Sequence, residues 1–393
     1  MCKPAPYAST YATWPAYSEE EARIVHDVLL SNRVNYWTGE QGKTFEKAFA
    51  EFAGTQFGIA VANGTLALEL AMRALNIQVG DEVIVPARTF MATASAVAVL
   101  GAVPVFADVD PDTQNICAKS VKQKISAKTK AVICVHLAGI PCDMDALLDI
   151  RDACNIALIE DCAQAHGAKY KGRSVGSFGD VAAWSFCQDK IMTTGGEGGM
   201  VTTDSEVLFH KMWSFKDHGK SFDTVFNKTH APGFRWLHES IGSNYRLSEM
   251  QAALGNYQLA KVDAWVARRS EIAQAYQAVL SRSSFIRYFS PSPHMQASYY
   301  RFYACWQHPS VSRETFLEQC KAQGLPVDQG VCPEVYMEKA FEGSPSRPEV
   351  SLPVAKKLGE QSLMFLTHPN LSDDEVSDIC KKLSDILEVY NTL

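Results

Sequence analysis

The sequence predicts an α/β protein built on a mostly parallel sheet with helices on both faces. Between residues 54 and 205, short apolar and β-branched runs alternate with helix-like segments. The runs are apolar throughout, which is typical of parallel strands that are buried on both faces. After Gly242 the strand signal fades and a helix-rich part begins. We therefore expect a three-layer domain followed by a smaller α+β domain.

The expected elements follow one another in a regular order. Strands are predicted at 57–62, 82–86, 103–108, 130–137, 156–160, 181–186 and 200–202, and helices at 65–75, 92–100 and 144–154. Further along, helices are predicted at 247–269, 312–323 and 373–389, with a strand at 299–306 and Pro-rich surface loops at 290–294 and 344–353. This change of pattern predicts a large domain over residues 1–250 and a small domain over 251–393.

Composition and charge argue against several classes of protein. The formal net charge of −7 gives no reason to expect a nucleic-acid partner. The eleven cysteines are scattered, with no CxxC pair and no metal-type histidine spacing, so we expect reduced thiols and no metal. No signal-peptide core precedes residue 20, and the most apolar stretch, 92–107, is shorter than a membrane span. We expect a soluble cytoplasmic protein without a membrane partner.

Lys190 lies in a constrained setting between two strand-like runs. It follows the apolar run 181–186 and precedes a Thr/Gly-rich turn at 193–199, after which apolar residues resume. A lysine that attacks a bound carbonyl must be held and partly desolvated. The segment alone is equally compatible with a solvated loop lysine, so the remaining motifs have to decide.

Two strand-to-helix junctions carry candidate ligand-binding residues. Gly64 and Thr65 stand where backbone N–H groups and a hydroxyl at a helix N-terminus can bind phosphate. The alternative is a plain turn with Thr65 as the N-cap. Phe90 follows the next strand, at the edge where open α/β sheets bind ligands. There it can stack on a flat ring, or else it belongs to the core.

Two carboxylates, Glu160 and Asp161, end a wholly apolar strand. A buried carboxylate is costly unless something positive pairs with it, and a protonated pyridine nitrogen is such a partner. A structural ion pair or a helix cap is the alternative for Asp161. Lys190 follows beyond one connection and can reach the same crevice. An amine, a ring-nitrogen carboxylate, a stacking aromatic and a phosphate-binding Gly-Thr pair are together what pyridoxal phosphate requires.

Six segments of the chain, taken in order, form a specific set of motifs. They are YWTGEQGKTFEKAFAEFAG (36–54), ANGTLALELA, PARTFMATASAV, EDCAQAHGA, SFCQDKIMTTGGEGG and GSNYRLSEMQAALG (242–255). In these segments the chain resembles the DegT/StrS-type sugar aminotransferases, a branch of the fold-type-I pyridoxal-phosphate enzymes. The resemblance implies an aspartate-aminotransferase-like fold. It also implies a transaminase that moves the amino group of L-glutamate to a keto-sugar in surface polysaccharide, lipopolysaccharide or amino-sugar biosynthesis.

The resemblance also implies roles for single residues. Lys190 is expected to form a Schiff base with the cofactor, and Asp161 to bind its pyridine nitrogen. Gln164 is expected to contact the phenolic oxygen of the ring, and Phe90 to stack on the ring. The residues expected to hold the phosphate are Gly64, Thr65, Ser185 and Asn244. In this family the last of them reaches in from the neighbouring subunit, so a homodimer with shared active sites is implied.

The acceptor sugar is less defined than the reaction. A nucleotide-linked keto-deoxysugar or a related sugar acid needs cations, although each candidate is also compatible with a plain surface role. The candidates are Arg33, Arg88, Lys220, Arg235 and Arg246, with His218 as a further substrate contact. Two departures from the family pattern bear on the substrate: one additional glycine in the 193–199 turn, and the triplet at 187–189 before the lysine.

Three other functions are compatible with parts of the sequence. A pyridoxamine-dependent sugar dehydratase looks similar throughout, but in that branch a histidine replaces the lysine, whereas this chain has Lys190. A non-catalytic homologue that only binds the cofactor has no need of both Lys190 and Asp161. A dinucleotide enzyme is disfavoured because no GxGxxG follows the first strand.

Overall fold

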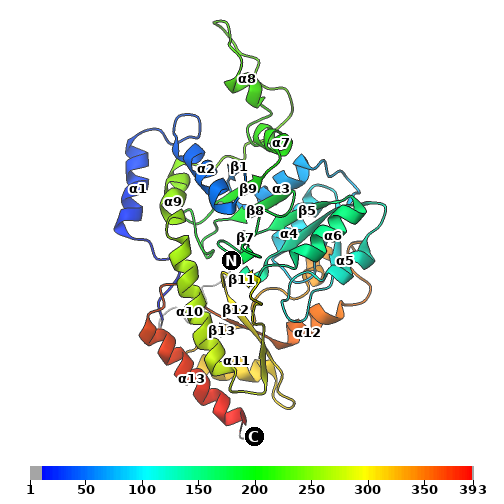
Figure 1. Ribbon diagram of the computed structural model, residues 1–393, viewed down its shortest axis with the longest axis vertical. Helices are drawn as coiled ribbons and strands as arrows, with labels where there is room; N and C mark the ends of the chain where they lie inside the picture. The colour runs from blue at the N-terminus through cyan, green and yellow to red at the C-terminus, as the bar shows by residue number, and fades with distance from the viewer. Residues whose placement is uncertain (1–10, 392–393) are drawn as a thin grey trace.

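The computed structural model describes residues 11–391. At its centre lies a seven-stranded sheet with the strand order β1-β9-β8-β5-β4-β2-β3 (Figure 1). The strands are β1 (Phe57–Val61), β2 (Glu82–Pro86), β3 (Val103–Ala107), β4 (Thr129–Val135), β5 (Ala157–Asp161), β8 (Val181–Ser185) and β9 (Gly199–Thr203). The pairings from β3 through β2, β4 and β5 to β8 are parallel, whereas β9 runs antiparallel to both β8 and β1. The predicted mostly parallel sheet is confirmed.

Helices cover both faces of this sheet. One face packs against α3 (Gly64–Ala74), α4 (Met91–Val99) and α7 (Glu206–Lys216), and the other against α2 (Gln41–Ala53), α5 (Ala118–Lys124) and α6 (Met144–Cys154). Within β2, Val83 and Val85 belong to the first hydrophobic cluster, while Ile84 between them belongs to a cluster on the opposite face. Because neighbouring side chains of a strand point to opposite faces, an all-apolar strand fits only such a double-sided burial.

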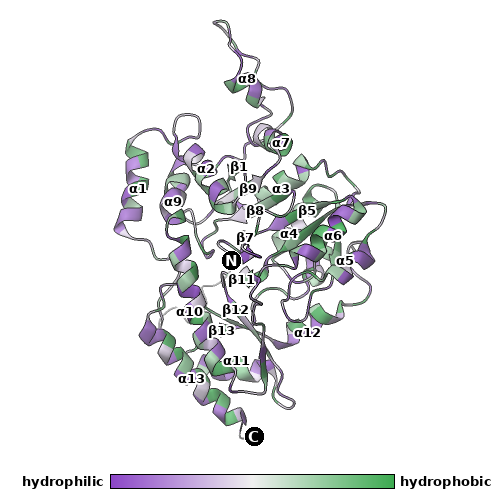
Figure 2. Cartoon of the chain, viewed as in Figure 1, coloured by the Kyte–Doolittle hydropathy of each residue, from purple (hydrophilic) through white to green (hydrophobic). Residues whose placement is uncertain are grey.

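A second, antiparallel sheet lies toward the C-terminal end of the chain, with the strand order β10-β12-β14-β13. Its strands are β10 (Ile286–Tyr288), β12 (Phe302–Trp306), β13 (Val327–Asp328) and β14 (Ser362–Phe365). It packs with α10 (Val262–Leu280), α11 (Arg313–Ala322) and α13 (Asp373–Asn391) around a separate hydrophobic core. Helix α13 carries hydrophobic and hydrophilic residues side by side, as a helix with one buried face does (Figure 2). The domain division near residue 250 stays a prediction.

Several predicted elements differ from the observed ones in detail. The helix expected over 247–269 is interrupted at Ala260–Lys261, which separates α9 (Glu249–Leu259) from α10. The strands β10 and β11 (Met295–Gln296) precede the first strand expected in this part. Helix α12 (Pro353–Gln361) begins at the end of the Pro-rich segment, because Pro353 occupies the first helical turn, where its missing N–H costs nothing.

Two further features concern the outside of the molecule. Helix α8 (Phe222–Phe226) and the segment 227–241 after it, which we call the protruding segment, extend away from the body (Figure 1). Within residues 11–391, no helix is both long enough and apolar enough to cross a membrane.

Candidate active site

The C-terminal ends of four strands meet at one edge of the central sheet. Strands β2, β5 and β8 run parallel to one another, and β1 runs in the same direction because β1 and β8 are both antiparallel to β9. Asp161 ends β5, Ser185 ends β8, Gly64 follows β1 and Phe90 follows β2. Residues far apart in the sequence are thus brought to the edge at which parallel sheets bind ligands.

The N-terminus of α3 lies at this edge and is capped by Asn63. The Asn63 side chain accepts a hydrogen bond from the Leu66 N–H at 2.9 Å. The alternative with Thr65 as the N-cap is therefore wrong. The first N–H groups of a helix have no partner within the helix, so those of Gly64 and Thr65 face the sheet edge as donors for an anion.

The absence of a side chain at Gly64 allows α3 to approach the ends of β8 and β9. A Cβ at Gly64 would lie 2.7 Å from Cβ and 3.1 Å from Oγ of Ser185. A Cβ at Gly199 would lie 2.9 Å from the backbone nitrogen of Gly64. Two glycines therefore create a cradle in which a hydroxyl and helix N–H groups converge, and this cradle fits a phosphate group.

Asp161 is a buried carboxylate that is held by neutral donors. It is only 6% exposed, and its Oδ1 accepts a hydrogen bond from the Ala163 N–H at 3.1 Å. Its Oδ2 accepts from the Thr93 hydroxyl at 3.0 Å, and that hydroxyl in turn lies 2.9 Å from the Thr89 hydroxyl. Burial raises the pKa of Asp161, although these donors and the charge of Lys190 partly oppose the rise. Among residues 11–391 no ion-pair partner contacts Asp161, so a protonated ring nitrogen fits there.

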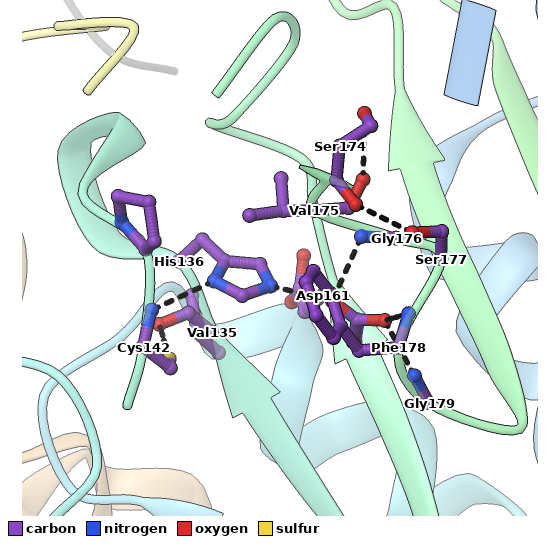
Figure 3. A network of polar contacts seen from close by, with 12 residues as sticks. Val135, His136, Cys142, Asp161, Ser174, Val175, Gly176, Ser177, Phe178 and Gly179 are labelled. Atoms are coloured by element: carbon purple, nitrogen blue, oxygen red, sulfur yellow. Dashed lines mark hydrogen bonds and ion pairs between the residues drawn. The ribbon is translucent and has the colours of Figure 1, made fainter. Parts of the chain in front are cut away.

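The neighbouring carboxylate, Glu160, is hydrogen bonded in a different network, of which His136, Gly176 and Phe178 are labelled in Figure 3. It accepts a hydrogen bond from His136 Nε2 at 3.0 Å, and His136 Nδ1 accepts from the Cys142 N–H at 3.0 Å. Three backbone N–H groups also donate to Glu160 at 2.6–2.7 Å, from Gly176, Phe178 and Gly179. Burial opposes its ionisation, but these donors hold the pKa of Glu160 below its ordinary value.

The network around Glu160 also holds the backbone of Asp161 in place through His136. His136, Glu160 and Cys162 lie close enough together to be considered as metal ligands. Both nitrogens of His136 and both oxygens of Glu160 are already hydrogen bonded within the protein, so the geometry does not favour a metal there. The backbone N–H of His136 also donates to the backbone oxygen of Asp161 at 3.2 Å, which fixes the end of β5.

Gln164 and Phe90 present groups that a flat aromatic ligand can use. The Gln164 Oε1 accepts a hydrogen bond from the Ala138 N–H at 2.8 Å, which leaves the amide nitrogen as a donor. Phe90 is the N-cap residue of α4 and is 64% exposed, so the alternative that it belongs to the core is wrong. An exposed phenylalanine at a ligand edge fits a stacking role.

Lys190 is half-buried and is contacted from distant parts of the chain. The Trp14 indole N–H donates to its backbone oxygen at 2.7 Å, and its Nζ lies 4.8 Å from the centre of the Tyr300 ring. Burial alone would lower the pKa of the Lys190 amine. The surrounding Tyr300, Asp189 and Asp161 outweigh that effect and raise the pKa. Lys190 is therefore held rather than freely solvated.

The candidate substrate cations do not form one cluster. Arg88 is 1% exposed and lies inside the protein. Its guanidinium donates to the Gln114 side chain at 2.9 Å and to the Ser362 hydroxyl at 2.7 Å. It therefore connects the loop after β2 with the first residue of β14. A role for Arg88 in substrate binding stays a prediction.

Two other candidates, Lys220 and Arg246, lie near the base of the protruding segment. Asp217 is fully buried, and its Oδ1 lies 3.0 Å from Lys220 Nζ and 2.8 Å from Arg246. Lys220 Nζ also lies 4.0 Å from the ring centre of Trp37. Four further residues that the sequence predicted for the site are exposed: Arg33, His218, Arg235 and Asn244.

Three residues of the site received no role from the sequence. Thr93 lies in the segment PARTFMATASAV, and its position in the first helical turn after Phe90 is the sequence feature that could have identified it. Asp189 was noted only as unusual. Tyr300 is more than a hundred residues away from Lys190, and no pattern in the sequence connects the two.

Comparison with known proteins agrees with this geometry. The model of the DegT/DnrJ/EryC1/StrS aminotransferase family matches residues 15–384. The chain belongs to this aminotransferase family. It is 34% identical over 374 residues to a GDP-perosamine synthase of Escherichia coli O157:H7, covering 94% of this chain and 96% of that protein.

Solved structures show the same relationship. An aminotransferase from Psychrobacter cryohalolentis has a TM-score of 0.95 and 48% identity, covering 97% of this chain and 100% of its own. A putative sugar aminotransferase from Streptococcus pneumoniae in its PLP form has a TM-score of 0.85 and 26% identity, covering 96% and 98%. The expected family and fold type are confirmed, and the protein is a pyridoxal-phosphate-dependent sugar aminotransferase, a transaminase that takes an amino donor and a keto-sugar.

Proposed function

We propose that this protein transfers the amino group of L-glutamate to a keto-sugar at the sheet edge formed by β1, β2, β5 and β8. The observation that carries the proposal is the environment of Asp161, which is a buried carboxylate with neutral donors only and has Lys190 nearby. A carboxylate in this state needs a cationic partner, and the ring nitrogen of pyridoxal phosphate supplies one.

Each residue at this edge has a defined task in the proposed reaction. Bound pyridoxal phosphate supplies an aldehyde that accepts an amino group and a ring that withdraws electrons. Asp161 keeps the ring nitrogen protonated, and Phe90 holds the ring by stacking. Gln164 donates to the phenolic oxygen of the ring. The Lys190 amine carries a proton between the α-carbon of the donor and the C4′ atom of the cofactor. The groups that bind the phosphate are the N–H groups of α3 and the hydroxyls of Thr65 and Ser185.

The acceptor is proposed to be a nucleotide-linked keto-deoxysugar or a related sugar acid that is used for surface polysaccharide or lipopolysaccharide. The GDP-perosamine synthases among the relatives support this class of acceptor. Lys220 and Arg246, which are partly buried near the base of the protruding segment, and the exposed Arg235 within it would meet its negative charge. Because Lys190 is present, we favour amino transfer over the sugar-dehydratase alternative. We also propose a cytoplasmic location, which the ten free cysteines among the described residues support.

A homodimer with shared sites is part of the proposal. Asn244 is exposed in this chain and its Oδ1 has only a weak contact, at 3.4 Å, with the Arg246 N–H. The protruding segment carries three strongly exposed apolar residues, Phe234 (81%), Trp236 (85%) and Ile241 (92%). A groove of about 670 Å³ beside this segment is lined by both apolar and charged side chains, including Arg73 and Phe222. Exposed apolar surface of this kind is typical of a subunit interface.

The proposal is tested with the purified protein and pyridoxal phosphate. The holoenzyme should be yellow, should lose this colour with L-glutamate, and should carry the cofactor on the Lys190 peptide after borohydride reduction. Lys190→Ala should abolish the label and the amino transfer, whereas Lys128→Ala, which changes an exposed lysine, should leave both unchanged. A protein that takes up no cofactor, or a Lys190→Ala variant that still transfers amino groups, would contradict the proposal. A panel of ketosugars in a glutamate-coupled assay identifies the acceptor.

A further inference from the structure

A group of three residues around Lys190 joins the lysine to the small sheet. The hydroxyl of Tyr300 donates a hydrogen bond to Oδ2 of Asp189, the residue immediately before the lysine. The Arg301 guanidinium lies 3.3 Å from the same oxygen. Tyr300 and Arg301 directly precede β12, so they come from a part of the chain that is distant in sequence and leads into the small sheet. The side chains of three residues from two distant segments therefore meet next to the amine.

The Tyr300 ring is positioned as a surface against which an ammonium group can rest. It is only 7% exposed and packs with the hydrophobic cluster of the large sheet. The Lys190 Nζ lies 4.8 Å from its centre, which is within the range of a cation–π contact. The Arg301 guanidinium lies 4.3 Å from the centre of the same ring. One aromatic ring thus contacts both cations, and Asp189 is the anion that contacts Arg301 and whose charge acts on Lys190.

Charge balance in this group depends on Arg301. Asp189 is half-exposed, with 48% of its side chain accessible, while the Arg301 side chain is 13% exposed. Burial raises the pKa of Asp189, but Lys190 and Arg301 together lower it below its ordinary value, so the carboxylate is ionised at neutral pH. An ionised Asp189 favours the protonated form of Lys190, and the guanidinium weakens this effect by neutralising the carboxylate.

We propose that Asp189, Tyr300 and Arg301 form a receiving site for the free amine of Lys190, which holds the amine whenever it is not joined to the cofactor. The inference rests on the proposed function, because a free amine arises at Lys190 only if this lysine binds and releases the cofactor. Tyr300 supplies the surface, Asp189 attracts the amine, and Arg301 limits how strongly the proton is retained. The unusual residue before the lysine thereby gains a specific role.

Other titratable groups around the amine also affect its protonation and have to be kept constant. Those that face it are Asp189 and Cys187 of its own segment, Asp161 of β5, His166 of the following turn, and Tyr300. None of the variants below changes Cys187, Asp161 or His166. A difference between variants therefore reports on the receiving site alone.

The test measures the protonation of Lys190 in the protein without cofactor. Competitive labelling with acetic anhydride over a range of pH, read out by peptide mass spectrometry, gives the inflection of Lys190 with exposed Lys128 as the internal reference. Asp189→Asn should move the inflection to lower pH by about one unit, because an anion near the amine is removed. Arg301→Gln should move it to higher pH, because Asp189 is then no longer neutralised.

Two variants that each remove a tyrosine hydroxyl distinguish the receiving site from any effect of losing a hydroxyl elsewhere in the protein. Tyr300→Phe keeps the ring but removes a hydrogen-bond donor from Asp189, so its inflection should shift in the same direction as that of Arg301→Gln and by less. Tyr288→Phe removes a hydroxyl in β10 whose partner is the backbone oxygen of Gln277 at 3.5 Å, and it should have no effect.

The outcomes distinguish the receiving site from the proposed function. If Asp189→Asn and Arg301→Gln change the melting temperature but leave the inflection of Lys190 in place, the three residues only connect the sheets and the inference is wrong. The inflections of Asp189→Asn and Arg301→Gln could shift in opposite directions although borohydride attaches no cofactor to Lys190. In that case the proposed function is wrong, while the effect of Asp189 and Arg301 on the amine is confirmed. Should Asp189→Asn fail to fold, the upward shift in Arg301→Gln alone decides.

Discussion

The hydroxyl of Thr93 donates a hydrogen bond to Oδ2 of Asp161 at 3.0 Å, across the gap between the first turn of α4 and the end of β5. Thr93 is 1% exposed, so water cannot replace this donor. With the Ala163 N–H on Oδ1, it fixes both carboxylate oxygens before any ligand arrives. A carboxylate fixed in this way can meet a ring nitrogen without losing further freedom.

Thr93→Val should therefore weaken cofactor binding while it keeps the shape of the side chain. A hydrogen bond to a charged group is worth about 1.5–3 kcal/mol, so we expect the dissociation constant of pyridoxal phosphate to rise about tenfold or more. Titration of the apoenzyme followed by absorbance gives this constant. Thr93→Ser keeps the hydroxyl and should remain close to the wild type; equal weakening in both variants would show that the methyl group, not the hydrogen bond, matters.

Asp161→Asn should stabilise the protein without cofactor while it slows the reaction. Burial raises the pKa of Asp161 above its value in the unfolded chain, so the folded state holds the proton more tightly. The free energy of unfolding then falls as pH rises through the interval between these two pKa values, and it stays lower above both. The asparagine variant lacks this loss, and its melting temperature at pH 7 should be higher than that of the wild type.

The matching measurement is thermal unfolding of both apoproteins at pH 4 and pH 7. The advantage of Asp161→Asn should be larger at pH 7, and a variant that is less stable than the wild type at pH 7 would contradict the assigned burial cost. The reaction of the enzyme with the amino donor should slow by about 10²-fold or more. The protonated ring nitrogen of the cofactor would then lie in a buried position without its carboxylate partner.

Phe90→Ala should affect the ligand rather than the fold. Since the ring is 64% exposed, its loss should change the free energy of unfolding of the apoprotein by no more than about 0.5 kcal/mol. Stacking on a flat ring is worth about 0.5–1.5 kcal/mol, so cofactor affinity should fall roughly two- to tenfold. Val99→Ala on the same helix, at a residue 67% exposed, is the matched control and should leave affinity unchanged. An unchanged affinity in Phe90→Ala would rule out the stacking role.

Mixing two inactive variants tests whether sites are shared between subunits. If Asn244 acts in the partner's site, the Lys190→Ala and Asn244→Asp lesions of a mixed dimer fall in the same site and leave the other site intact. Random reassociation should then restore about a quarter of the wild-type activity, since half of the dimers contain one intact site. Activity that never exceeds the sum of the separate variants would mean that Asn244 acts within its own chain.

Replacing the exposed aromatic residues tests the interface directly. Phe234→Ser combined with Trp236→Ser removes apolar surface from the protruding segment. We expect a monomer in light scattering, with a melting curve that remains cooperative. Val350→Ser, at another exposed apolar residue outside this segment (78% exposed), should leave the oligomeric state unchanged. A dimer that survives the double substitution would place the interface elsewhere.

The sequence was most informative where structure depends on neighbours along the chain. The strand at 82–86 and the helix at 144–154 have the bounds that the sequence predicted, because apolar runs and caps such as Asp143 are local signals. The short strands β10 and β13 were not predicted. With three and two residues they have no period of their own, and they form only because β12 and β14 offer partners.

The same distinction applies to the site. Lys190, Asp161 and Gly64 could be found because each lies next to a strand or helix end that the pattern marks. The buried state of Arg88 could not be found, because its partners Gln114 and Ser362 come from separate parts of the chain. The contact of Tyr300 with Lys190 likewise exists only once the small sheet has packed against the large one.

The buried position of Arg88 restricts how the molecule can move. Its guanidinium bonds to Ser362 in the small sheet and to Gln114 in the loop after β3, and sliding the small sheet away would take one of the two acceptors from a buried cation. Removing one partner of a buried charge is strongly unfavourable. We therefore expect catalysis without a hinge between the two sheets, so that the turnover number stays insensitive to solvent viscosity.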